Sequence, residues 1–173
     1  MLYYHASPVP LTLSKLEPNR LFFISNHKEF VINEFLFGKQ YKFLYEIELK
    51  KSKLKTFDLL KTKHFKLWLN YCKKEYGQYA YKILNTTISN GYLAFHAEGE
   101  ILPILQENNL NSCLFDELGA YIVGDKVNEW REFLQKEYGD VEINSLAIID
   151  PKIIKKIKLE VIRCESNELV YGD

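Results

Sequence analysis

The sequence predicts an α+β fold in one domain, and three observations lead to this prediction. The chain has 173 residues, of which 47% are hydrophobic, enough for one sizeable core. Short aromatic-rich runs bounded by turn residues indicate strands, and longer stretches with apolar residues at helical spacing indicate helices. No internal repeat, low-complexity tract or linker divides the chain, so we expect one α+β domain over residues 1–173.

The two N-terminal strands each end in small polar residues. Leu2-Tyr3-Tyr4 runs into His5-Ala6-Ser7-Pro8, and Leu21-Phe22-Phe23-Ile24 runs into Ser25-Asn26. A strand that ends this way brings its polar side chains to the rim of the sheet, where they can meet a ligand while the strand stays packed. A histidine that only caps a turn gives the same pattern, and the pattern alone does not separate the two interpretations.

A helix, a strand and a basic run follow. Asn26 is a suitable helix N-cap with Glu29 at the capping-box position, and the helix is expected to end at Gly38. Residues 41–49 predict a half-buried strand, because their second half alternates between apolar side chains and glutamates. We interpret the lysine-rich run 50–55 as a solvated edge or turn rather than a binding patch.

The rest of the chain predicts several helices and strands. Apolar residues recur at helical spacing over 65–76, 80–88 and 130–138, and a glycine follows each of these stretches, so we expect three helices there. Pro103 suits the first turn of a further helix. Short apolar runs predict strands over 146–149 and 157–162. Two further apolar runs flank a carboxylate pair and a glycine, which predicts a hairpin over residues 112–123.

The composition argues against several classes of protein. Basic and acidic residues number 23 each, which argues against a dedicated nucleic-acid binder but leaves room for a local basic patch. The cysteines, Cys72, Cys113 and Cys164, are odd in number and far apart, so they indicate neither a disulfide framework nor a zinc site. Reduced thiols, no visible signal peptide and no long apolar segment lead us to expect a cytoplasmic protein without a membrane partner.

Few residues match a catalytic pattern. The chain has no GxxxxGK[ST], GxGxxG or GxSxG motif. His96 lies near two glutamates, but their i,i+2 spacing brings the groups together only on a strand, and we favour a solvated segment over a metal site. Asp116 and Glu117 form a carboxylate pair beside a predicted strand end. Such a carboxylate can accept a hydroxyl proton or stabilise a developing cation, although by residue pattern alone an ordinary Asp-Glu turn explains the pair better.

The order of three segments resembles ADP-ribosyltransferase-like proteins. Tyr4 to Ser7, Leu21 to Ser25 and Tyr41 to Ile47 are similar to the first three strands of that family. There, an aromatic-His-Gly/Ala-Ser/Thr opening is followed by a strand ending in Ser or Thr, a helix and a Tyr-containing strand. His5 to Val9 and Asp116 to Ile122 most resemble the phage anti-CRISPR members of the family, and the likeness covers roughly half of the chain in separate pieces.

The resemblance implies a split, twisted mixed β-sheet that holds NAD, the co-substrate, in a central cleft. It implies that a histidine hydrogen-bonds the adenosine-side ribose, that its two neighbours lie near the nicotinamide amide, and that a serine and a stacking tyrosine shape the nicotinamide pocket. The residues in these positions are His5, then Ala6 and Ser7, then Ser25 with Tyr79 or Tyr81.

The resemblance also implies one catalytic acid, which binds the nicotinamide-ribose hydroxyl and stabilises the oxocarbenium-like state as nicotinamide leaves. The anti-CRISPR likeness places this acid at Asp116 or Glu117. The family's usual acid precedes a late strand, and in that register Glu142 is the nearest carboxylate. A side chain or base of the target then attacks the ribose carbon.

The expected function is NAD-dependent mono-ADP-ribosyl transfer to a macromolecule, which we take to be a bacterial defence protein or another host protein. A degenerate transferase fold that serves as a protein-binding module is one alternative, and it predicts no NAD binding. A transferase that modifies nucleic acid is another, and it requires a basic rim near residues 50–55. The helical segment 65–104 exceeds what a minimal transferase needs and is a candidate surface for target selection.

Overall fold

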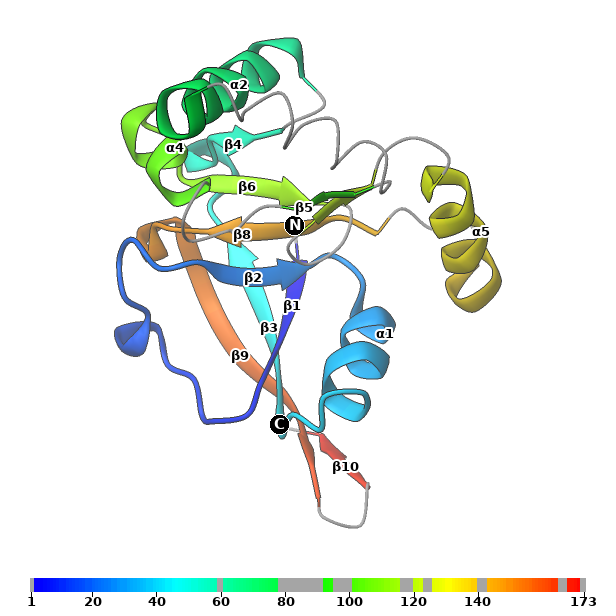
Figure 1. Ribbon diagram of the computed structural model, residues 1–173. Helices are drawn as coiled ribbons and strands as arrows, with labels where there is room; N and C mark the ends of the chain where they lie inside the picture. The colour runs from blue at the N-terminus through cyan, green and yellow to red at the C-terminus, as the bar shows by residue number, and fades with distance from the viewer. Residues whose placement is uncertain are drawn as a thin grey trace. The chain divides into compact units, whose positions relative to one another are not determined.

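The computed structural model describes residues 2–58, 61–77, 92–94, 101–115, 120–122, 126–139, 143–164 and 168–171. Strands and helices both occur throughout these residues, which confirms the α+β class (Figure 1). The chain divides into two compact units, one of Met1–Leu54 with Ile143–Asp173 and one of Lys55–Glu142. The first unit is therefore built from the two ends of the chain, and the second from its middle.

The first unit is built on antiparallel strands in the order β10–β9–β3–β1–β2–β8. These strands are β1 Leu2–Ser7, β2 Phe22–Ser25, β3 Phe43–Leu49, β8 Ser145–Ile148, β9 Ile154–Arg163 and β10 Leu169–Tyr171. The helical segments are η1 Leu13–Lys15, α1 Lys28–Val31, the π-helical η2 Ile32–Phe37, η3 Lys51–Lys53 and η6 Pro151–Ile153.

The strand register separates two faces of this sheet, because directly paired residues point to the same side. On one face His5 pairs with Tyr45, and the connector between β1 and β2 packs there, where the Leu11 N–H donates to the Tyr45 hydroxyl at 2.8 Å. We call this the connector face. On the other, Ala6 and Leu44 are buried under α1 and η2, and we call it the helix face (Figure 1).

Helix α1 begins one residue later than predicted. Its N-cap is His27, not Asn26, and the His27 Nδ1 accepts the backbone N–H three residues on at 3.2 Å. The Asn26 Oδ1 is used elsewhere, because it accepts the Asn144 N–H at 2.7 Å. The helical segment does end before Gly38, where a Cβ atom would lie 2.6 Å from the Glu34 carbonyl oxygen. Glycine therefore lets the chain pass close to the π-helical last turn.

The described part of the second unit contains two separate strand pairs. Strand β4, Thr56–Phe57, pairs in parallel with β6, Ser112–Phe115, and β5, Tyr92–Ala94, pairs antiparallel with β7, Ala120–Ile122. The hairpin predicted over 112–123 is therefore wrong, since β6 and β7 both form but pair with different strands. A local pattern shows that a strand can form, whereas its partner is selected by residues far away in the sequence.

The helices of the second unit follow the predicted spacing. Within the described ranges they are α2 Thr62–Tyr76, α4 Leu102–Glu107 and α5 Lys126–Tyr138. Helix α2 buries Trp68 and Cys72 and ends at Gly77, whose φ of 55° suits glycine best. The helix predicted over 80–88 lies outside the described residues. None of the helices in the described ranges is both long and apolar enough to cross a bilayer.

We predict that Leu44→Ala lowers the free energy of unfolding by about 2–5 kcal/mol, because Leu44 is fully buried in the centre of the sheet. Leu13→Ala is the matched control, since Leu13 is 44% exposed, and it should change stability by less than about 0.5 kcal/mol. Urea denaturation followed by far-ultraviolet circular dichroism measures both. Equal effects would contradict the assignment of this core.

Candidate functional site

Strands β1 and β2 meet at a narrow junction. Their register pairs one position, Tyr4 with Ser25, whereas β1 pairs with β3 along its whole length. Strand β2 runs in a clearly different direction from β1 and pairs instead along its length with β8 (Figure 1). The sheet of the first unit is therefore least continuous between β1 and β2.

His5 lies at this junction and joins the two strands through its side chain. Its Nδ1 is 2.6 Å from the Phe23 carbonyl oxygen, and since a carbonyl only accepts, Nδ1 is the protonated nitrogen. The imidazole packs against the Phe22 ring with centroids 4.3 Å apart. The residue is half-buried, and its Nε2 makes no hydrogen bond with the residues that the structure describes.

Burial keeps the His5 imidazole neutral. Loss of solvation lowers the pKa of His5 to about 4, and the hydrogen bond to Phe23, which favours the charged ring, offsets only part of this effect. At neutral pH the ring therefore carries its one proton on Nδ1 and presents Nε2 as an acceptor. Such a ring can accept a hydrogen bond from a hydroxyl group but does not offer a positive charge to a phosphate.

Ala6 and Ser7 are both buried but point to opposite faces of the sheet. Ala6 lies on the helix face. Ser7 shares the connector face with His5, and its Oγ accepts the Val9 N–H at 3.3 Å. The Ser7 hydroxyl therefore supports the turn by which the chain leaves β1.

Ser25 lies on the helix face, because it pairs with Tyr4. Its Oγ accepts the His27 N–H at 3.4 Å, next to the start of α1. Its partner on β8, Ser145, is fully buried, and the Ser145 hydroxyl has no hydrogen-bond partner in the described part of the chain. The structure thus brings His5 and Ser7 to one face of the sheet and places Ser25 on the other.

The other predicted site residues are not described. Asp116, Glu117, Glu142, Tyr79 and Tyr81 all lie outside the described residues. The described chain does show that β6 ends at the residue before Asp116, so the carboxylate pair follows a strand as expected.

A small pocket adjoins Phe22, the residue on which the His5 ring packs. It has a volume of about 160 Å³ and is lined by Lys15, Leu16, Glu17, Arg20, Leu21, Phe22, Ile148, Pro151 and Ile154. Ligand pockets commonly measure about 300–1,000 Å³, so this pocket can hold one ring or side chain but not a whole dinucleotide. Sequence reasoning missed it, because its lining comes from two stretches far apart in the sequence, residues 15–22 and residues 148–154.

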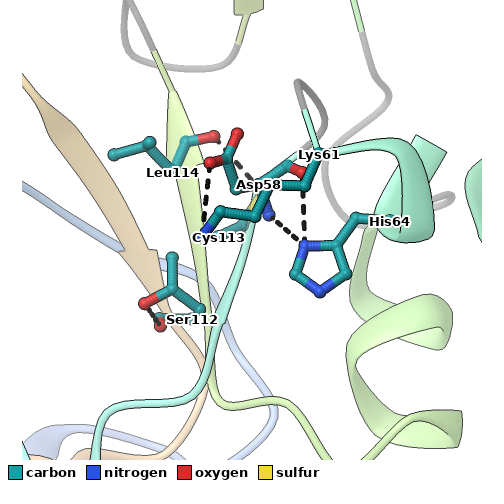
Figure 2. Close-up of polar contacts among 7 residues, drawn as sticks. Asp58, Lys61, His64, Ser112, Cys113 and Leu114 are labelled. Atoms are coloured by element: carbon teal, nitrogen blue, oxygen red, sulfur yellow. Dashed lines mark hydrogen bonds and ion pairs between the residues drawn. The ribbon is translucent and has the colours of Figure 1, made fainter.

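A polar cluster in the second unit has a structural role. Figure 2 shows the His64 ring beside the Asp58 backbone, where the Asp58 N–H donates to the His64 Nδ1 at 2.8 Å. The imidazole also stacks on Phe57, with centroids 5.1 Å apart. The cluster therefore ties β4 to α2. Across the described residues, no group of three or more His, Cys, Asp or Glu side chains could hold a metal ion.

Comparison with family models, with curated proteins and with solved structures finds no match to this chain.

We predict that His5 titrates near pH 4, and that folding stability falls as the pH decreases from about 6.5 toward 4. The folded-state pKa is below the ordinary value, so between these pH values the unfolded chain binds more protons than the folded one. The contribution is fully present above pH 6.5 and amounts to at most roughly 3 kcal/mol.

Nuclear magnetic resonance of the imidazole nitrogens gives the pKa and the tautomer directly. His5→Gln should remove this part of the pH dependence in denaturation experiments. An imidazole that titrates near 6.5, or one that is protonated on Nε2 at neutral pH, would contradict the assigned geometry.

Proposed function

We propose that the protein is an NAD-dependent mono-ADP-ribosyltransferase that modifies a macromolecular target. The motif resemblance supports this proposal, and the observation that carries it is the state of His5 at the β1–β2 junction. The ring is neutral, its tautomer is fixed by the Phe23 carbonyl, and Nε2 is an acceptor. This is the chemistry that the family's opening-strand histidine needs in order to hold a ribose hydroxyl.

In the proposed complex, a hydroxyl of the adenosine-side ribose donates to the His5 Nε2. The Nδ1 bond and the Phe22 ring hold the imidazole in place before NAD arrives, so little side-chain freedom is lost on binding. Because the His5 imidazole is neutral, it does not attract the pyrophosphate of NAD. It therefore contacts NAD through the ribose hydroxyl.

The proposed reaction forms one bond and breaks another at the nicotinamide-side ribose. As the glycosidic C–N bond breaks, its electron pair goes to the nicotinamide nitrogen, and positive charge develops on the ribose. A carboxylate, Asp116 or Glu117, or in the alternative register Glu142, hydrogen-bonds the ribose hydroxyl and stabilises this charge. A nucleophile of the target attacks the ribose carbon and loses its proton to a base or to water.

The fold supports this proposal at a coarse level. The α+β class and the narrow junction between β1 and β2 are compatible with the split sheet that the resemblance implies. We take the acceptor to be a protein and the compartment to be the cytoplasm. A protein-binding module on a degenerate transferase fold is the competing function, and NAD binding separates the two.

We predict that neutralising the catalytic carboxylate abolishes ADP-ribosyl transfer while NAD still binds. Among Asp116→Asn, Glu117→Gln and Glu142→Gln, one variant should lose at least about 100-fold in labelling rate, the usual effect of removing a preorganised transition-state contact. The measurement is transfer of label from NAD to the proteins of a host lysate. Glu132→Gln, at an exposed position of α5, is the matched control and should keep full activity.

Two results would contradict this function. Undiminished labelling in all three carboxylate variants would overturn the assignment of the acid. Absence of both labelling and NAD binding in the wild-type protein would overturn the transferase proposal and favour the binding module.

We predict that His5→Asn weakens NAD binding by about 10-fold or more, the loss of one good hydrogen bond and its ring contacts. An asparagine places its amide donor near the position of Nδ1, so the bond to Phe23 can persist while the Nε2 acceptor is lost. The same change at His27 is the control, because asparagine is a favoured helix N-cap. Isothermal titration with NAD measures binding, and thermal melting measures folding. If His5→Asn binds NAD as tightly as the wild type, His5 only links β1 to β2 and does not contact NAD.

A further inference from the structure

The chain has a formal net charge of +0, but its basic and acidic residues are concentrated in different parts of the sequence. Between residues 50 and 82, acidic residues are rare and lysines are frequent. The acidic residues are Asp58 and Glu75, and the ten lysines are Lys50, Lys51, Lys53, Lys55, Lys61, Lys63, Lys66, Lys73, Lys74 and Lys82. Residues 83–142 show the reverse bias, with eleven acidic and three basic residues. The basic character is thus local, and four of the ten lysines lie on helix α2.

Helix α2 gathers four of these lysines on one side. At about 100° per residue, Lys63, Lys66, Lys73 and Lys74 fall within an arc of roughly 100°, opposite the buried Trp68. All four side chains are exposed. We call these four residues the lysine face. The helix buries its apolar side in the usual way and presents the lysine face to solvent.

Two residues of the lysine face, Lys63 and Lys66, have no acidic partner in the described part of the chain. Lys74 lies 3.8 Å from Glu75 and 3.7 Å from Glu107, but its side chain is 67% exposed. Exposed pairs of this kind are weak and screened by salt. Lys63 and Lys66 therefore keep their positive charge, and Lys74 is only weakly neutralised.

The charge pattern also opposes the stability of the helix itself. The first turn of α2 has no acidic residue, and Lys63 lies near the positive end of the helix dipole. Lys61, at the N-cap, is partly compensated, because its Nζ lies 3.7 Å from the Asp58 carboxylate. A cation at this end disfavours the helix. Local conflicts of this kind are expected where a surface serves a function.

We propose that the lysine face docks the phosphate backbone of duplex nucleic acid. The four lysines extend over about 16 Å along the helix axis, close to the rise of five base pairs. The residue between them on this face, Asn70, is polar, and no aromatic ring is present to stack on a base. A protein partner would normally require apolar or aromatic anchors at the centre of the contact, which this face does not offer. The contact is therefore independent of base sequence.

This docking surface goes beyond the proposed transferase activity and does not depend on it. Nucleic-acid binding is measured without NAD, so either idea can fail while the other stands. If both hold, the acceptor is confined to nucleic acid or to molecules bound beside it.

We predict that the protein binds two unrelated 20-base-pair DNA duplexes with equal affinity. Fluorescence anisotropy between 50 and 200 mM salt should give a slope of log K against log salt of about −3, as three to four phosphate contacts imply. The triple variant Lys63→Gln, Lys66→Gln and Lys73→Gln should lose most of this slope and at least 10-fold in affinity at 50 mM salt. Glutamine has nearly the helix propensity of lysine, so α2 should remain folded, as circular dichroism can verify.

The matched control is the triple variant Lys39→Gln, Lys136→Gln and Lys152→Gln, which changes the net charge equally at exposed positions that are not part of α2. Its affinity should stay within about two-fold of the wild type, because only lysines near phosphates release counterions. No binding of either duplex at 50 mM salt, or equal losses in the two triple variants, would overturn the proposal.

Discussion

The narrow contact between β1 and β2 is the constraint on which the candidate site depends. With one paired position between these strands, the side chain of His5 supplies a link that the backbone does not, from Nδ1 to the Phe23 carbonyl. Leaving a buried donor unpaired costs about 1–3 kcal/mol, so the packing that covers the ring also requires this bond. The same burial holds the ring neutral. A structural need thus fixes which nitrogen of the His5 ring carries the proton.

The antiparallel pairing of β1 and β2 means that the two strands do not end at one shared rim of the sheet, as the sequence led us to expect. Strands that run in opposite directions finish at opposite ends of their contact, so Ser7 and Ser25 do not meet there. His5 and Ser25 also point to different faces. One ligand can touch both only where the two strands separate, and the dinucleotide of the proposed function is long enough to do so.

Much of the fold could be predicted, because several signals are local. Alternation in β3 marks its buried side chains, and Gly77 and Gly139 end helices with positive φ. Other features depend on distant partners. Asn26 looks like a helix cap, but its side chain is committed to Asn144, 118 residues away. Strand β10 has mostly exposed side chains and pairs through its backbone, so no apolar pattern reveals it.

The argument from composition against nucleic-acid binding has a short reach, because it sums charge over a distance that electrostatics does not cover. At physiological ionic strength the field of an exposed charge is screened within about 8 Å. A phosphate approaching Lys63 and Lys66 therefore responds to the lysines of α2, while acidic residues farther away contribute little. Two surfaces of opposite sign can coexist on a chain whose formal charge is +0. The physical quantity that decides binding is the charge within one screening length of the contact, and Lys63 and Lys66 each add positive charge there.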